Sequence, residues 1–251
     1  MAKPVIEAHP ALVIVYNTSK FPRLLLSIYD AGYRGGKGPY PFAANVIGGN
    51  PDIKEKDNSS LEVLTREVKE EFNPDYQIDN PKTNIFKQRV LWAKPRDIKL
   101  VRDNILTNLK PFKDFYVQAK PFAEGTAEYN ALFSYFFSEI SEETLGIVES
   151  NLRRQKTLTT EGLVGIFSLG ELENDPRGQL TTAHATAPVL NYAFGSSILH
   201  PSEIKIKALG LPRSSFQDYL TDFEYSKEQK PNHNNPSKMD PSFYEVVFGE
   251  L

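Results

Sequence analysis

The chain has 251 residues, enough for one or two domains with a sizeable buried core. Its 29 basic and 32 acidic residues leave a net charge of −3, so no large field favours nucleic acid or a membrane surface as a partner. The absence of cysteine excludes disulfides, thiol nucleophiles and cysteine-ligated metal sites. The sequence has no signal-peptide pattern and no apolar run of membrane-spanning length, which predicts a soluble, cytoplasmic protein.

Two apolar runs near the N-terminus predict a β-hairpin. Residues 11–17 and 23–30 are rich in β-forming side chains and are separated by the turn-like stretch TSKFP. The loop AGYRGGKGPYP follows, and residues 42–49 predict a third strand that ends on the pair Gly48 and Gly49.

The stretch after residue 59 predicts an amphipathic helix. Ser60 is a suitable N-cap, and Asn73 followed by Pro74 ends the helix because proline cannot continue it. Apolar residues recur at spacings of three and four and form one stripe toward the core: Leu61, Leu64, Val68 and Phe72.

Strands and helices alternate irregularly along the rest of the chain. Further strands are predicted at 84–93, 115–122, 130–140 and 162–169, and helices at 97–109, 141–155 and 186–194. No internal repeat is visible, so we expect the α/β (α+β) class, with mixed layers of sheet and helix around one core.

The composition changes after residue 200. Residues 1–200 are expected to form one domain, with helical insertions near 95–125 and 141–160, and residues 201–251 a C-terminal appendage that is partly flexible. The polar stretch KEQKPNHNNPSKMDP cannot bury enough apolar surface to offset its chain entropy, whereas FYEVVF can pair with a sheet edge or a partner subunit.

Three acids crowd one flank of the predicted helix in TREVKEEFNP. Glu67, Glu70 and Glu71 are three and four residues apart, a spacing at which like charges repel by a few tenths of a kcal/mol per pair, ~0.2–0.5. One interpretation is an ordinary solvated face, because Arg66 and Lys69 lie among the acids. The other is a site for a hard divalent cation, which prefers oxygen ligands.

The order of these features resembles the Nudix box, GX5EX7REUXEEXGU with U aliphatic. Residues 66–71, REVKEE, match its REUXEE core, and Gly48 and Gly49 match the glycine pair that opens it. A second stretch, from Glu161 to Leu172, resembles the strand and turn that close the Nudix sheet. With the strands before and between them, the two matches cover roughly residues 10 to 200.

The match to the box has departures. Sixteen residues separate Gly49 from Arg66, whereas the box has thirteen, so the loop is longer. Counting back from Arg66 puts Asn58 where the first Glu of the box belongs, and Glu55 substitutes only if the loop folds back. Asn73 and Pro74 stand for the usual Gly and aliphatic residue.

The resemblance implies a Nudix-type fold, a mixed sheet sandwiched between helices, and a hydrolase dependent on Mg²⁺ (or Mn²⁺). Such a hydrolase would cleave a diphosphate linkage in a nucleoside-diphosphate-linked small molecule. Glu67, Glu70 and Glu71 are implied as metal ligands, or one of them as the base, and Arg66 as the residue that orients Glu67 or a neighbouring carboxylate. Glu161 is implied as an accessory catalytic acid, and a plain strand-edge acid is the alternative.

The substrate contacts are less sharply defined. Gly48 and Gly49, with Arg34 and Lys37 from the preceding glycine-rich loop, are candidates for the phosphates. A small-molecule nucleotide is the expected partner, without nucleic acid or membrane, and a homodimer is left open. Two other functions remain open: a Nudix-fold protein that binds a nucleotide or regulates without cleaving, and a structural α/β protein.

Overall fold

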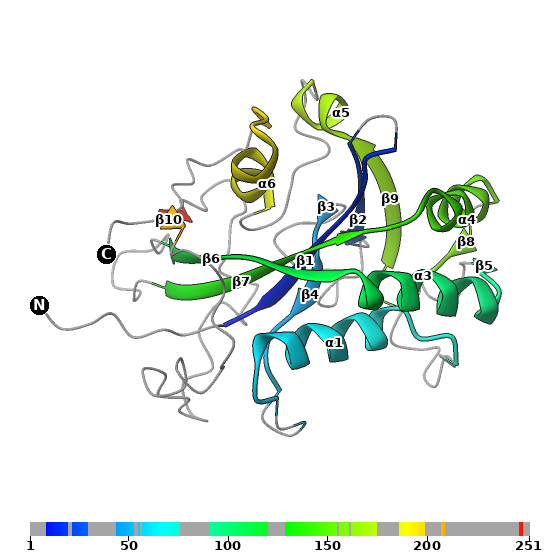
Figure 1. Ribbon diagram of the computed structural model, residues 1–251, viewed down its shortest axis with the longest axis horizontal. Coiled ribbons are helices and arrows are strands. Elements are labelled where there is room, and N and C mark those ends of the chain that lie inside the picture. Colours follow the sequence, from blue (N-terminus) through cyan, green and yellow to red (C-terminus); the bar gives the residue numbers. More distant parts are fainter. Residues whose placement is uncertain are drawn as a thin grey trace, which may run out of the picture.

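The computed structural model describes residues 9–19, 22–29, 44–52, 55, 57–75, 91–119, 129–154, 156–160, 162–174, 186–198, 207–208 and 246–247. It is an α/β structure in which one mixed sheet is covered by helices on both faces (Figure 1). Within the described residues, no helix is both long enough and apolar enough to cross a bilayer.

Five long strands form most of the sheet: β1 (Ala11–Asn17), β2 (Arg23–Tyr29), β6 (Leu109–Ala119), β7 (Tyr129–Glu139) and β9 (Gly162–Ser168). β1 pairs in parallel with β7, and the other pairings of these strands are antiparallel. The sheet is therefore mixed, as the sequence predicts.

The segment 44–49 fills the space where β1 and β2 separate. Its first part, β3 (Ala44–Asn45), pairs with β2, and its second part, β4 (Ile47–Gly49), pairs with the first residues of β1. The predicted single strand over 42–49 is therefore two short strands joined at Val46, because the segment passes from one partner to another.

Helices cover both faces of the sheet. One face carries α1 (Ser60–Glu71), α3 (Pro95–Thr107) and α4 (Glu142–Arg153), and the other carries α5 (Leu169–Glu173) and α6 (Thr186–Phe194) (Figure 1). The core on the α1 side includes fully buried side chains from the sheet and from all three helices: Val13, Val63, Val68, Val101 and Val148.

Short strands lie at the margins. β5 (Leu91–Trp92) and β8 (Lys156–Thr157) form a separate parallel pair. β10 (Lys207–Ala208) and β11 (Val246–Val247), from the predicted appendage, both pair antiparallel with β6. The stretch FYEVVF thus contributes a strand to a sheet edge in the same chain.

The predicted helical insertion near 95–125 needs correction. Of its described residues, 95–119, only 95–107 are helical. The strand β6 begins at Leu109, although the sequence pattern predicts a helix to residue 109 and a strand from 115. Pairing with β7 extends the strand backward through Pro111, which cannot continue a helix, at the cost of a register shift between Pro111 and Lys113. The predicted helix that starts after Ser141 is confirmed as α4.

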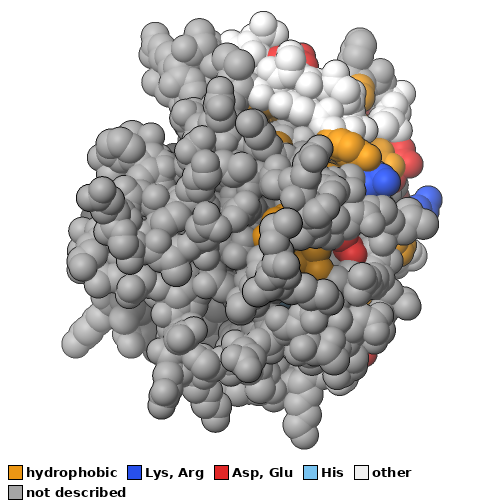
Figure 2. Space-filling model, turned by 90° about the vertical axis from the view of Figure 1, so that its left-hand side faces the viewer, with side chains coloured by type: hydrophobic (Ala, Val, Ile, Leu, Met, Phe, Trp, Pro, Cys, Tyr) orange, Lys and Arg blue, Asp and Glu red, His pale blue; other side chains and the backbone are white. Residues whose placement is uncertain are grey.

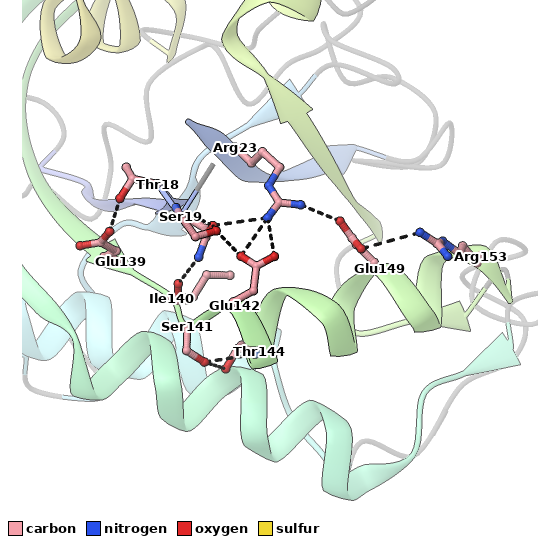
Figure 3. A network of polar contacts seen from close by, with 11 residues as sticks. Thr18, Ser19, Arg23, Glu139, Ile140, Ser141, Glu142, Thr144, Glu149 and Arg153 are labelled. Atoms are coloured by element: carbon pink, nitrogen blue, oxygen red, sulfur yellow. Dashed lines mark hydrogen bonds and ion pairs between the residues drawn. The ribbon is translucent and has the colours of Figure 1, made fainter. Parts of the chain in front are cut away.

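A polar network joins the β1–β2 turn to α4 (Figure 3). Arg23 contacts Glu142 at 3.0 Å and Glu149 at 2.9 Å, and Asn17 donates from its amide to the carbonyl of Ile140 at 2.8 Å. These contacts hold the first turn of α4 against the hairpin. They lie at the end of β1 away from the glycine pair, so this network is separate from the acids of α1.

Candidate functional site

The helix α1 starts one residue earlier than predicted. Ser59, not Ser60, is the N-cap: its hydroxyl accepts a hydrogen bond from the backbone N–H of Glu62 at 3.1 Å. In return the Glu62 carboxylate accepts from the backbone N–H of Asn58 at 2.6 Å. Both bonds tie the preceding loop to the first turn.

The buried face of α1 also differs from the predicted stripe. Leu64, Val68 and Phe72 are fully buried as predicted, but Leu61 is 48% exposed and Val63 takes a buried place instead. This rotation brings the flank that carries Glu67 and Glu71 toward β4. Two of the three predicted acids therefore face the sheet rather than solvent.

Glu67 lies directly against the glycine pair. A Cβ atom built on Gly49 would be 2.5 Å from the carboxyl carbon of Glu67 and 2.6 Å from each of its oxygens. Any side chain at this position would have to displace the carboxylate. An alanine at 49 would thus force the end of the Glu67 side chain to move, whereas the backbone conformation of Gly49 does not itself call for glycine.

Gly48 is required for a different reason. Its φ of +135° is a conformation that side-chain-bearing residues rarely adopt, and a Cβ there would lie 2.2 Å from the carbonyl oxygen of Ala11. The backbone N–H of Gly48 donates to Oε1 of Glu71 at 3.1 Å. The two glycines of the predicted motif are therefore both in contact with the acid helix, each through a different glutamate.

Glu71 is the most buried of the three acids. It is 4% exposed, and its second oxygen, Oε2, accepts a hydrogen bond from the hydroxyl of Ser27 on β2 at 3.2 Å. A buried carboxylate is costly without donors, and here a backbone N–H and a hydroxyl supply them. Glu71 thereby links three elements, β2, β4 and its own helix.

Arg66 donates hydrogen bonds to the other two acids, Glu67 and Glu70. Its Nη1 atom donates to Glu67 at 2.8 Å and to Glu70 at 3.1 Å, and Nη2 donates to the carbonyl of Asn50 at 2.8 Å. Burial alone would lower the pKa of Arg66, but the hydrogen bond to Asp57 and the charge of Glu67 raise it above its usual range. The guanidinium therefore stays charged and offsets the repulsion between the carboxylates.

Asp57 is a site residue that sequence reasoning missed. It accepts from Nε of Arg66 at 3.1 Å and from Nη2 at 3.0 Å, and its side chain is only 6% exposed. Asn58, the position given by counting back from Arg66, is exposed. The acid that pairs with Arg66 thus lies one position before the one that motif counting gives.

Thr160 holds the C-terminal end of α1. Its backbone N–H donates to the carbonyl of Glu71 at 2.8 Å, and its hydroxyl donates to the carbonyl of Glu70 at 3.1 Å. The last carbonyls of a helix have no partner within the helix, so these bonds satisfy two of them. The sequence offers no pattern that would have identified this contact.

The structure brings six of the nine predicted site residues together: Gly48, Gly49, Arg66, Glu67, Glu70 and Glu71. The other three, Arg34, Lys37 and Glu161, lie outside the described residues.

The three glutamates do not converge on a single point. Glu70, whose side chain is 57% exposed, shares Arg66 with Glu67, whereas Glu71 is turned to Ser27. In the part of the chain that the structure describes, no three His, Asp or Glu side chains are grouped closely enough to hold a metal ion. The chemistry of the donors still suits a hard cation, since Mg²⁺ typically uses one or two protein carboxylates with waters and phosphates.

The described surface also carries a few large apolar side chains. Exposed large apolar side chains are spread over three elements, with Leu61 on α1, Leu91 on β5 and Tyr192 on α6. On the side seen in Figure 2, the described surface shows hydrophobic side chains beside a few acidic and basic ones. Comparison of the sequence with protein-family models and with curated proteins found no match in either.

Proposed function

We propose that the chain is a Nudix-type hydrolase that cleaves a diphosphate linkage in a nucleoside-diphosphate-linked small molecule, with Mg²⁺ or Mn²⁺ as its cofactor. The observation that carries the proposal is the contact between the glycine pair and the acid helix. Glu67 occupies the place of a side chain at Gly49, and Glu71 accepts from Gly48. On an acidic face that met only solvent, no carboxylate would lie against the facing strand in this way.

The acids are suited to a hard cation. Glu67 and Glu70, with Glu71 beside them, would hold it through carboxylate oxygens, the donors that Mg²⁺ and Mn²⁺ prefer. When bound, such an ion would supply positive charge to the substrate phosphates and would lower the pKa of a bound water. Without that positive charge, a diphosphate would be repelled by the three carboxylates.

The remaining residues of the site orient these groups. Arg66 keeps the carboxylates of Glu67 and Glu70 side by side, and Asp57 fixes the guanidinium from its other edge. Gly49 lets the acid helix lie close to β4, since Glu67 fills the place of its Cβ, and the place of a Cβ at Gly48 is filled by the backbone of Ala11. Glu67 is our candidate for the base or a ligand, because it lies between Arg66 and the glycine pair.

One observation favours the second candidate, a nucleotide-binding or regulatory protein without turnover. Glu67 and Glu70 are bound by Arg66, and Glu71 is bound by Gly48 and Ser27, so the chain itself supplies a donor to each acid. An acid helix that is satisfied internally can be stable without a metal ion.

The two candidates are separated by a substrate panel. We would incubate the protein with dinucleotides, nucleotide sugars and nucleoside triphosphates, each with Mg²⁺, with Mn²⁺ and with a chelator, and measure phosphate-containing products. Metal-dependent release from at least one class is the expected result. Nucleotide binding by calorimetry with no product from any class would contradict the hydrolase and favour the binding protein.

A further inference from the structure

Ser27 connects the β2 strand to an acid of α1. It is 8% exposed, and its hydroxyl donates to Oε2 of Glu71 at 3.2 Å. The other carboxylate oxygen of Glu71 accepts from the backbone of Gly48 at 3.1 Å. The two donors come from different strands and hold the carboxylate from both sides.

We propose that Ser27 is a positioning residue of the cation site, an inference that rests on the proposed function. Its hydroxyl fixes the rotation of the Glu71 carboxylate, and with it the orientation of the oxygens available to a metal ion. Groups that hydrogen-bond to metal ligands pre-organise them, and their loss typically lowers metal affinity about 10- to 100-fold. Ser27 contributes no ligand atom itself.

The sheet makes Ser27 a rigid reference point. On one side Ser27 pairs with Val164 of β9, and on the other with Asn45 of β3. The preceding residues Leu24, Leu25 and Leu26 are all buried with at most 1% exposure. The strand is therefore a fixed support from which the hydroxyl of Ser27 holds the Glu71 carboxylate.

A second serine of the same sheet provides a matched control. Ser134 on β7 is fully buried, and in the described part of the chain its hydroxyl has no hydrogen-bond partner. It pairs with Ala11 of β1. Its strand, β7, does not pair with β2, the strand that carries Ser27. Replacing Ser134 with alanine removes the same atom from a buried strand without touching an acid of α1.

The test compares Mn²⁺ binding by the full chain and its variants. Free Mn²⁺ is followed by electron paramagnetic resonance during titration, and the bound spectrum reports the symmetry of the site. Ser27→Ala is expected to weaken affinity about 10- to 100-fold and to change the bound spectrum. Ser134→Ala is expected to match wild type in both. Thermal melting checks that each variant is folded.

The outcomes separate this inference from the proposed function. If wild type binds no Mn²⁺, the metal-dependent hydrolase itself fails, and the role of Ser27 with it. If wild type binds and Ser27→Ala binds equally well with an unchanged spectrum, Ser27 is not a positioning residue, while the hydrolase stands. Should Ser27→Ala not fold, Ser27→Cys keeps the shape with a weaker donor. Weaker Mn²⁺ binding by that variant would then support the role of Ser27, and unchanged binding would overturn it.

Discussion

Asp57 accepts two hydrogen bonds from Arg66, at 3.1 Å from Nε and 3.0 Å from Nη2, through the single oxygen Oδ2. The same oxygen accepts from the backbone N–H of Asp52 at 3.1 Å. Asp57 therefore ties the loop between the glycine pair and α1 to Arg66, the residue that donates to Glu67 and Glu70. The loop is longer than in the Nudix box, yet an acid still reaches the arginine.

Asp57→Asn is expected to lower the free energy of unfolding by about 1–3 kcal/mol, because it weakens a largely buried charge-assisted pair. It should also lower turnover, since Arg66 loses its fixed orientation. Urea denaturation and the hydrolysis assay measure the two effects.

Asn58→Asp is the matched control for this substitution. It places an acid where motif counting expects one, but Asn58 is exposed and the Arg66 fork is already filled by Asp57. The double variant Asp57→Asn/Asn58→Asp should therefore behave like Asp57→Asn. Full recovery in the double variant would show that the position of the acid is not fixed by the loop.

Replacing each of the two glycines, Gly48 and Gly49, with alanine is expected to have a different effect on stability. Gly48→Ala should destabilise by at least about 2 kcal/mol in any background, because its φ is positive and its Cβ would meet the backbone of Ala11. Gly49→Ala should lower the free energy of unfolding by about 1–3 kcal/mol in wild type. Most of that decrease should vanish in the Glu67→Ala background, where the clashing carboxylate is gone. Thermal denaturation of the four-member cycle of Gly49 and Glu67 variants measures this coupling.

Gly146 serves as the control glycine for that cycle. It is exposed within α4, and nothing lies within 4 Å of the position of a Cβ. Gly146→Ala should stabilise the protein by about 0.5–1 kcal/mol, as expected for a helix interior. Additive effects of Gly49→Ala and Glu67→Ala would contradict the contact on which the proposed site depends.

Local sequence patterns predict most of the secondary structure and one side of the site. The hairpin of β1 and β2, the helices α1, α4 and α6, and the flank with Glu67, Glu70 and Glu71 follow from periodicity and capping. Asp57, Ser27 and Thr160 do not. Their contacts with α1 depend on how two connecting segments and the strand β2 pack in three dimensions. A hydroxyl 44 residues away from its carboxylate leaves no local pattern.

The burial of His9 should make the free energy of unfolding depend on pH. Burial lowers the pKa of His9 from 6.5 to about 4. Between those values the unfolded chain binds a proton that the folded chain does not, so the free energy of unfolding falls as pH falls from 6.5 to 4, by up to about 3 kcal/mol. Urea denaturation at pH 7 and pH 4.5 should show a smaller loss for His9→Gln than for wild type. An equal loss in both would show that His9 is not responsible.

Truncation after residue 226 tests the role of β11. The deletion removes two residue pairs on the edge of β6, Val246 with Ala119 and Val247 with Gln118, and leaves β10 in place. We expect the core to fold with only a small decrease in melting temperature, because a strand of two residues contributes little. Loss of folding, or of a dimer seen by light scattering, would instead place FYEVVF in the core or at a subunit interface.

The metal-dependent role of the acid helix is tested most directly by Glu70→Gln against Glu62→Gln, compared for Mg²⁺-dependent turnover and Mn²⁺ affinity. Both residues are glutamates of α1, but Glu70 shares Arg66 with Glu67, whereas Glu62 accepts from the backbone of Asn58. Glu70→Gln should lower turnover at least about 10- to 100-fold and weaken the metal, with folding unharmed. Glu62→Gln should leave both unchanged. Identical metal affinity in wild type, Glu70→Gln and Glu71→Gln would contradict the account and leave these carboxylates with a structural role alone.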